Sequence, residues 1–309
     1  MTVTNNVDLD TGSTREDIAR ALHSLQAQVR NDLGGRVPTT EDVVVAVRKS
    51  AFPGALSDRR VAVAGDWHVN QHWVEQIIPR ISAHDPSIRT ILHAGDFGIW
   101  PGERGESFLR AVDEVCAESG ITRVLVTPGN HEDWHQLERR FASRPGEAVQ
   151  FSDAVWVMPR GHRFAIAGAQ FLSFGGAASI DRDRRIEGVT WWPGELPTDA
   201  EVDAAIAGGS ADVMISHDMV DRGIPALDHQ ILRSDGWPST SLAMSALSRN
   251  RVTRVWEGVQ PKVLFHGHMH TAAVSPSGSP RVVSLGCDGT RGNIMLLDLP
   301  ALTHEWLPE

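Results

Sequence analysis

Cysteine is scarce in this chain of 309 residues, and neither Cys116 nor Cys287 stands in a spacing typical of a zinc site or a disulfide framework. Residues 1–10 lack the basic start and the apolar core of a secretory signal. No apolar run approaches the length that crosses a bilayer. These absences predict a cytoplasmic protein with reduced thiols and no membrane partner.

Basic residues are also few: the chain has 29 lysines and arginines against 39 aspartates and glutamates, which gives a formal net charge of -10. Non-specific binding to nucleic acid depends on neutralising backbone phosphates, so we expect no strong binding of this kind. Bound cations could still reverse the sign of the potential locally. With 41% hydrophobic and 22% charged residues, the composition is that of a folded globular protein.

Residues 1–58 are predicted to form a short helical extension before one large domain over residues 59–309. Apolar residues recur at spacings of three and four over 18–33, behind a capping box, which predicts a helix. A second helix is predicted over 40–49. Since the extension carries no cluster of metal-ligating residues, we interpret it as a packing or dimerising segment, with a regulatory role as the alternative.

The first half of the large domain alternates strands with helices. Apolar, β-branched runs predict strands at 60–64, 90–94 and 124–126. Apolar residues at helical spacing predict helices between them, over 74–81 and 108–116. This alternation implies parallel strands joined by right-handed crossovers.

After residue 139 the pattern changes to short strand candidates bounded by glycine, at 155–158, 164–167 and 170–174. Short strands without long helices between them favour antiparallel pairing or a second sheet. The remaining predicted elements are strands at 212–215, 262–265, 281–285 and 294–297 and a helix over 240–256.

Side chains that can hold a metal ion follow several of these strands directly. They are Asp66 and His68 in Gly-Asp-Trp-His, Asp96 in Ala-Gly-Asp, Asn130 beside His131 in Gly-Asn-His-Glu, His217 in Ser-His-Asp, and His268 and His270 in Gly-His-Met-His. Ligands of open α/β sheets bind at the carboxyl ends of the strands, so we expect these side chains to converge. Asp66 and His68 are two residues apart on a segment expected to be extended, which would place both on one side.

This order of motifs resembles that of the calcineurin-like metallophosphoesterase superfamily, in a bacterial or phage-type member, over roughly residues 60–299. Single motifs of this kind recur by chance, but all five in this order are specific. The resemblance implies an α/β fold, a four-layer α/β/β/α sandwich of two mixed sheets. It also implies a pair of metal ions: Asp96 bridges them, Asp66, His68 and His270 complete the first ion's ligands, and Asn130, His217 and His268 complete the second's.

Two divalent ions about 3.5 to 4 Å apart can generate a hydroxide nucleophile near neutral pH and stabilise both reacting oxygens of a phosphate ester. Imidazole and carboxylate ligands suit Mn, Fe or Zn rather than Ca. The resemblance further implies that His131 protonates the leaving alkoxide as general acid. The alternative is that His131 only orients Asn130.

One position departs from the superfamily pattern. Many members place an acid near the bridging aspartate to pair with the acid histidine, whereas this chain has Ile99 there. Either a carboxylate such as Glu132 or Asp133 supports His131, or the pKa of His131 is tuned differently.

The segment 175–195 combines arginines with paired tryptophans after a predicted strand, and it resembles a stretch of bacterial and phage metallophosphoesterases. Such residues can grip a phosphate and stack a base, so Asp181, Arg185 and Trp191 are candidate substrate-binding residues. The alternative is a salt-bridged loop with its tryptophans packed inward.

The sequence as a whole predicts a phosphoric ester hydrolase with a small phosphate-ester substrate. We favour a phosphodiester, either a small nucleotide or a nucleic acid end, over a phosphomonoester. A protein-serine/threonine phosphatase is disfavoured because Asp96 lacks the Asp-Arg-Gly continuation of that group. A catalytically silent scaffold for protein binding is the competing hypothesis, and a nuclease in a larger complex would need a basic groove or a coiled-coil insertion that the sequence does not show.

Overall fold

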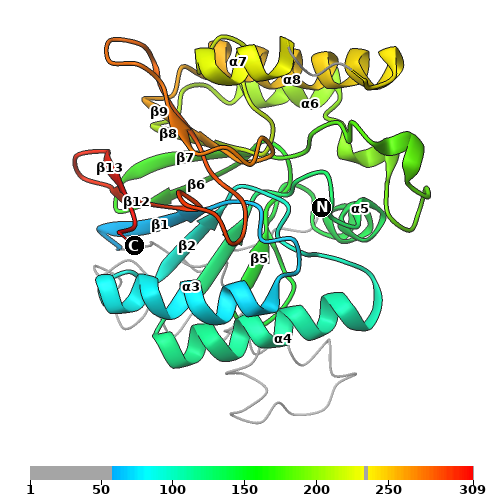
Figure 1. Ribbon diagram of the computed structural model, residues 1–309. Coiled ribbons are helices and arrows are strands. Elements are labelled where there is room, and N and C mark those ends of the chain that lie inside the picture. Colours follow the sequence, from blue (N-terminus) through cyan, green and yellow to red (C-terminus); the bar gives the residue numbers. More distant parts are fainter. Residues whose placement is uncertain (1–57, 233–235, 309) are drawn as a thin grey trace, which may run out of the picture. The chain divides into compact units, whose positions relative to one another are not determined.

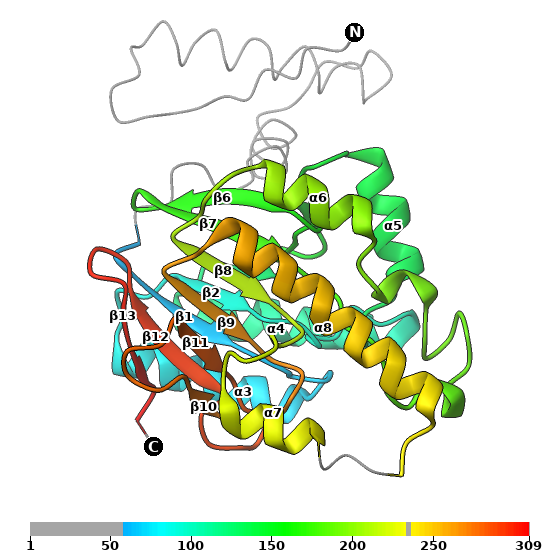
Figure 2. The ribbon, with the colours of Figure 1, turned by 90° about the horizontal axis from the view of Figure 1, so that it is seen from above.

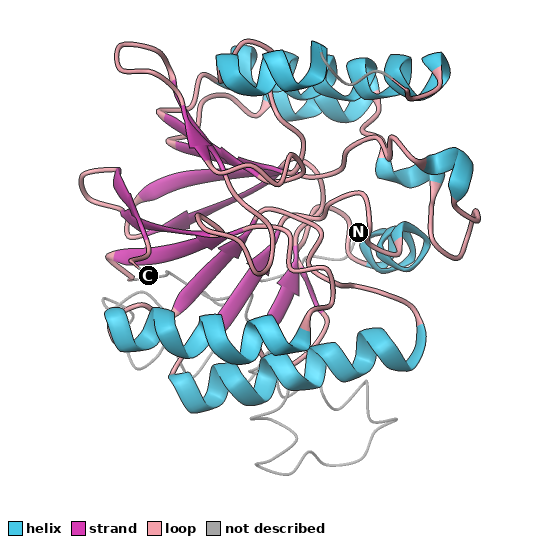
Figure 3. Cartoon of the chain, in the orientation of Figure 1, coloured by secondary structure: helices cyan, strands magenta, loops and turns pink. Residues whose placement is uncertain are grey.

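A computed structural model describes residues 58–232 and 236–308. The described residues form two mixed sheets that face each other, with helices on the outer face of each (Figure 1; Figure 3). The predicted α/β/β/α sandwich is therefore confirmed. The helices predicted over 18–33 and 40–49 lie outside the described residues, and the domain boundary near residue 58 stays a prediction.

The first sheet has seven strands in the order β13-β12-β1-β2-β3-β5-β4. Their bounds are β1 Arg60–Ala64, β2 Thr90–His93, β3 Arg123–Val126, β4 Val149–Gln150, β5 Val155–Val157, β12 Ile294–Asp298 and β13 Thr303–Trp306. Strands β1, β2 and β3 are parallel, as the strand–helix alternation predicted. The segment 155–158, expected to pair antiparallel or to join a second sheet, forms β5 in this sheet, parallel to β3 and antiparallel to the short β4. Helices α3 (Gln71–His84) and α4 (Gly102–Ser119) make the crossovers and cover the outer face (Figure 1).

The second sheet has six strands in the order β10-β11-β9-β8-β7-β6. Their bounds are β6 His162–Ile166, β7 Ala169–Phe174, β8 Val213–Ser216, β9 Val263–His266, β10 Ala273–Val274 and β11 Arg281–Ser284. Strands β6 and β7 form the antiparallel pair that the glycine-bounded segments predicted. Helices α6 (Asp199–Ala207), α7 (Pro225–Leu232) and α8 (Ser239–Val259) cover this sheet, and Figure 2 shows α8 crossing its strands beside α6.

The structure adds two points that the sequence pattern did not give. The predicted closing strands at 281–285 and 294–297 join different sheets, because β11 pairs with β9 while β12 pairs antiparallel with β1. Helix α6 was not predicted, although Thr198 and Glu201 form a capping box at its start. Among the described helices, none combines the length and the apolar character that a bilayer crossing requires.

Buried apolar side chains fill the space between each sheet and its helices. In the first layer Val74, Ile77, Ile78 and Ile81 of α3 pack with side chains of α4 and the sheet. Burying one such side chain contributes about 1.5 to 3 kcal/mol. The central strands are thereby held rigidly, and the loops at their carboxyl ends start from fixed positions.

The β6–β7 hairpin offers a test of local backbone strain. Its two-residue turn has positive φ at both positions, 48° at Ala167 and 84° at Gly168. Asparagine adopts this region more readily than alanine. We expect Ala167→Asn to raise the free energy of unfolding by about 0.5 to 1 kcal/mol in chemical denaturation. The matched change Ala165→Asn, on the exposed face of β6, should not stabilise; equal effects of the two changes would contradict the turn assignment.

Candidate metal centre

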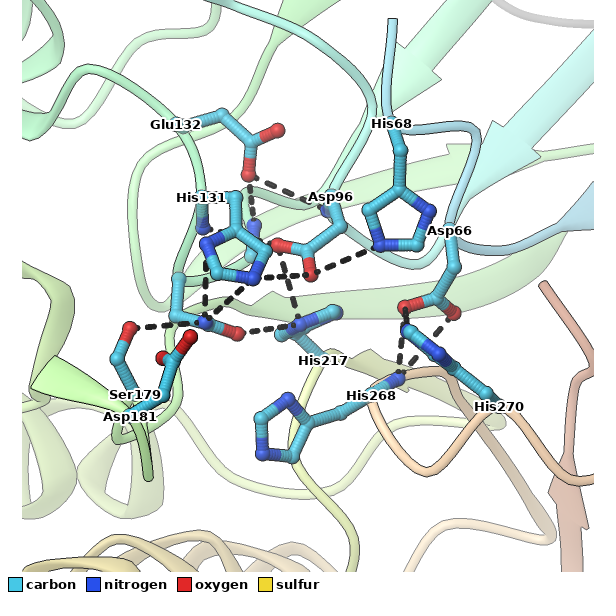
Figure 4. A network of polar contacts seen from close by, with 12 residues as sticks. Asp66, His68, Asp96, His131, Glu132, Ser179, Asp181, His217, His268 and His270 are labelled. Atoms are coloured by element: carbon cyan, nitrogen blue, oxygen red, sulfur yellow. Dashed lines mark hydrogen bonds and ion pairs between the residues drawn. The ribbon is translucent and has the colours of Figure 1, made fainter. Parts of the chain in front are cut away.

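The loops after five strands bring the predicted metal-ligating side chains together (Figure 4). Two groups have ligand atoms that all lie within 4.8 Å of one another: Asp66, His68, Asp96 and His270 form the first, and Asp96, His217 and His268 form the second. Asn130 belongs with the second group, because its Oδ1 lies 2.9 Å from Nε2 of His217. All seven predicted ligands therefore lie in one cluster, with Asp96 common to both groups.

The cluster lies at the edge of the sandwich where loops that follow strands of both sheets come together. Loops of the first sheet supply Asp66, His68, Asp96 and Asn130, and loops of the second sheet supply His217, His268 and His270. Asp96 reaches across the seam, with Oδ1 3.3 Å from Nε2 of His217 and Oδ2 3.6 Å from Nε2 of His68. Neither sheet alone contains a complete group.

The backbone at these residues is unusual. Five of the seven side chains stand on residues with positive φ: Asp66 at 52°, His68 at 49°, Asp96 at 51°, His268 at 64° and His270 at 52°. The expectation of an extended segment from Asp66 to His68 was wrong, because the chain turns after β1 and both residues are left-handed. Each such non-glycine residue costs about 1 to 3 kcal/mol and persists only where the surroundings impose it.

Hydrogen bonds between loops impose this conformation. The amide of Asp66 donates to the carbonyl of Gly95 at 3.0 Å, and the amide of His68 donates to the carbonyl of Asp96 at 2.8 Å. The amide of His268 donates to Oδ1 of Asp66 at 3.0 Å. The loops from β1, β2 and β9 therefore hold one another in position.

Two motif glycines let backbone approach the carboxylates closely. A Cβ atom at Gly267 would collide with Oδ2 of Asp66, and one at Gly129 would collide with Oδ1 of Asp96. No larger residue fits either place without displacing a carboxylate. This close approach explains why glycine precedes His268 and Asn130 in their motifs.

The charges of the cluster favour a bound cation. Asp66 and Asp96 are 0% and 2% exposed. Burial by itself would raise the pKa of Asp96, but the neighbouring His131 and His217 hold that pKa well below its usual range. Burial likewise opposes charge on His217 and His68, yet the charge and hydrogen bonds of Asp96 raise their pKa values to about 10 and about 9.

The donor atoms fit a divalent transition metal. Nδ1–H of His217 donates to the carbonyl of Ala94 at 2.7 Å, so Nε2, which faces Asp96 and Asn130, is the ring nitrogen that would bind a metal ion in exchange for its proton. Such a hydrogen bond to the other ring nitrogen is what orients histidine ligands in metal sites. A set of imidazole, carboxylate and amide donors suits Mn, Fe or Zn.

Glu132 has a role that the sequence interpretation missed. Its buried carboxylate accepts hydrogen bonds from the amides of Phe97 at 2.7 Å, Gly98 at 3.2 Å, Asp96 at 3.3 Å and also Gly129. Burial and the charge of Asp96 raise the pKa of Glu132 to about 7, against these hydrogen bonds. Glu132 therefore joins the loops after β2 and β3.

Neither carboxylate proposed as a partner of His131 serves that purpose. Glu132 receives backbone amides, and Asp133 caps α5 (Trp134–Ser143) by accepting from the amide of Gln136 at 3.0 Å. Ile99, in place of the usual acid, is a buried core residue. Glu132 and Asp133, the two carboxylates named as candidate partners of His131, are therefore engaged elsewhere.

His131 instead faces an arginine. Its Nε2 lies 3.3 Å from Nη2 of Arg185 and 3.8 Å from Oδ2 of Asp96. Burial lowers the pKa of His131, and the charge of Arg185 lowers it further, whereas the charge of Asp96 raises it. Burial is thus the main cause of the lowered pKa of His131, and a positive neighbour from the segment 175–195 adds to it.

That segment divides into parts beside the site and parts in the core. Nε of Arg185 donates to Oδ1 of Asp181 at 2.6 Å, so both residues lie close to His131. Trp192 packs into the first core layer, as the inward-packing alternative stated. Trp191 is partly exposed, with the guanidinium of Arg182 6.0 Å from its ring. Its contact with a substrate stays a prediction.

Comparisons with known proteins point to one family. A family model described as calcineurin-like phosphoesterase matches residues 59–272. The chain is similar to a protein of Mycobacterium tuberculosis named precorrin-6A reductase, with 25% identity over 243 residues, 70% of this chain and 91% of that protein.

Solved structures with a similar fold share few identical residues with this chain. The protein TT1561 of Thermus thermophilus is 14% identical, with 82% of this chain and 100% of that chain covered and a TM-score of 0.49. The phosphopantetheinyl hydrolase of Mycobacterium tuberculosis is 13% identical, with 77% and 95% covered and a TM-score of 0.44.

The glycine beside Asp66 can be tested directly. We expect Gly267→Ala to displace the Asp66 carboxylate and to weaken Mn binding roughly 10-fold or more, measured by calorimetric titration of the metal-free protein. Gly278→Ala is the control, because Gly278 has positive φ but no atom near the place of a Cβ. That control should lose stability and keep its Mn affinity. Equal Mn affinities in Gly267→Ala and the wild type would contradict the close approach.

Proposed function

Because the chain belongs to the calcineurin-like phosphoesterase family, we propose that it hydrolyses phosphate esters with two divalent ions, Mn, Fe or Zn, bound at the seam between its sheets. The family uses divalent metal ions, which supports the coarser statement that the protein is a metal-dependent phosphoesterase. The observation that carries the two-ion proposal is the sharing of Asp96 by both groups of ligand atoms.

The two oxygens of Asp96 point to different groups, one toward His68 and one toward His217. A carboxylate in this position can hold two cations at a fixed separation. When bound, such ions would activate a water molecule and neutralise the charge of a phosphate ester. The remaining ligands, Asp66 and His270 on one side and Asn130 and His268 on the other, would complete the two sites.

His131 is proposed as the general acid. Its side chain is 20% exposed and borders the cluster through Asp96, so its Nε2 can reach a bound substrate. In the free protein an N–H of Arg185 faces that nitrogen. A phosphoryl oxygen is a stronger acceptor for guanidinium, so a bound ester would engage Arg185 and leave Nε2 of His131 free. Nε2 would then take a proton from solvent and donate it to the leaving oxygen.

The substrate class is proposed from the residues around His131. Arg185 and Arg182 supply donors for phosphate oxygens, and the partly exposed Trp191 offers a surface for a nucleobase. These groups favour a phosphodiester of a small nucleotide or a nucleic acid end, with a phosphomonoester as the alternative. The convergence of every predicted ligand weighs against a catalytically silent scaffold.

A reductase activity is not proposed, although the name of the similar mycobacterial protein mentions one. The loop after β1 carries Asp66 and His68, where a dinucleotide-binding protein would carry a glycine-rich turn for the pyrophosphate. These side chains favour metal binding over cofactor binding at that strand end.

The bridging role of Asp96 predicts a severe loss on neutralisation. We expect Asp96→Asn to reduce the Mn-dependent hydrolysis of bis-p-nitrophenyl phosphate by about 10²-fold or more, because one carboxylate would serve both ions. Asp203→Asn, at an exposed aspartate of α6, is the control and should keep wild-type turnover. Equal rates in Asp96→Asn and the wild type would rule out the two-ion proposal.

The acid role of His131 predicts dependence on the leaving group. We expect His131→Ala to lose roughly 10² to 10⁴-fold in kcat/KM on alkyl esters, and much less on nitrophenyl esters, whose leaving group needs no proton. Mn affinity should stay at the wild-type value. His135→Ala, at an exposed residue of α5, is the matched control. A uniform loss across leaving groups would argue for a positioning role instead.

A further inference from the structure

We infer that each of the two ions has one ligand oriented by a carboxylate outside the five motifs. Asp288 orients His68 in the first group, and Glu195 orients Asn130 in the second group through Ser179. The inference rests on the proposed two-ion function. It assigns positioning residues, since neither carboxylate belongs to the groups of candidate ligands.

Asp288 uses both carboxylate oxygens beside the first group. Oδ1 lies 2.9 Å from Nδ1 of His68, and Oδ2 accepts from Nδ2 of Asn70 at 2.5 Å. Nδ1–H of His68 donates to Asp288, so Nε2, which faces Asp96, is the ring nitrogen that would bind a metal ion in exchange for its proton. Carboxylate, imidazole and cation in this order form an arrangement that fixes the ring and increases its basicity.

The loop that carries Asp288 is tied to the strand end it serves. The amide of Asp288 donates to the carbonyl of Asp66 at 2.8 Å. Nδ2 of Asn293 donates to the carbonyls of Gly286, at 2.7 Å, and Gly65. Asp288 lies beyond residues 59–272, the part of the chain that the family model matches. The segment after that part therefore contributes to the first group.

The second carboxylate acts through a hydroxyl group. Nδ2 of Asn130 donates to Oγ of Ser179 at 3.0 Å, and that hydroxyl donates to Oε2 of Glu195 at 2.7 Å. The amide of Ser179 donates to Oε1 of Glu195 at 2.7 Å. Ser179 and Glu195 are both buried.

This chain of hydrogen bonds determines which way the Asn130 amide points. Because Glu195 accepts the proton of Ser179, the Ser179 oxygen can only accept, and it must face the NH₂ end of Asn130. Oδ1 of Asn130, the end that can hold a cation, then faces Nε2 of His217. Without the hydroxyl the amide could flip and present hydrogens to the ion.

Glu195 is itself held in place by a buried arginine. Nη2 of Arg160 donates to the carbonyls of Gly194 at 2.6 Å and Glu195 at 2.7 Å. The guanidinium of Arg160 lies 3.8 Å from the ring centroid of Trp134. The segment 175–195 thus has a structural task beside the ligands as well as the proposed contact with substrate.

Measuring Mn affinity separately at each group of ligands tests both parts of the inference, the role of Asp288 and the role of Glu195 with Ser179. We would titrate Mn into the metal-free full chain calorimetrically, for the wild type, Asp288→Ala, Ser179→Ala and the double variant. Reference titrations of His270→Ala and His268→Ala identify which binding event belongs to the first group and which to the second. Asp288→Ala should weaken Mn binding at the first group by about 10 to 100-fold, and Ser179→Ala should weaken Mn binding at the second group to a similar extent. Each single variant should leave the other event unchanged, and the double variant should weaken both.

Milder variants separate orientation from damage to the fold. Asp288→Asn keeps an acceptor for His68 and should bind Mn with intermediate affinity, as should Glu195→Gln for the other event. Asp203→Ala, at an exposed aspartate, is the control and should match the wild type. Thermal unfolding of the metal-free variants should stay close to the wild-type temperature.

The possible failures are distinguishable. Two Mn ions bound with wild-type affinities by Asp288→Ala and Ser179→Ala would overturn the inference and leave the proposed function standing. Equal weakening of both events by each single variant would also overturn it. A wild-type protein that binds fewer than two Mn ions would instead overturn the proposed two-ion function on which the inference rests.

Discussion

The arrangement of the site depends on one buried charge, the carboxylate of Asp96. A carboxylate removed from water is stable only where donors or positive groups surround it. The amide of His131 donates to it at 2.9 Å, and His68 and His217 lie on opposite sides of it. Because these partners come from both sheets, satisfying this charge requires the two halves of the sandwich to meet at one edge.

Much of the fold was predictable because its signals are local. Continuous apolar runs mark β1, β2 and β3, and the strand–helix alternation implies their parallel pairing. Parallel strands expose their carboxyl ends at a common edge, so the order of the motifs was enough to predict that Asp66, Asp96 and the histidines would converge. The antiparallel β6–β7 pair was also predictable, because the glycines that bound its short strands are a local signal.

The remaining features of the site could not be predicted, because they depend on contacts between residues far apart in the chain. Local sequence patterns carry no information about such contacts. Glu132 and Asp133 are neighbours with the same charge, yet one gathers amides from two loops and the other caps a helix. The pairing of Asp288 with His68 spans 220 positions. The left-handed backbone at Asp66 is held by a hydrogen bond to the loop after β2. The rule that residues two apart on an extended strand point to the same side could therefore not predict it.

The four amides collected by Glu132 make the loops after β2 and β3 one rigid body. Asp96 and Asn130 belong to that body, so the distance between these two candidate ligands is held by a residue that belongs to neither group of ligand atoms. A molecule that binds between these loops would therefore meet a fixed spacing of ligand atoms, and a change at Glu132 would alter that spacing for every bound molecule alike.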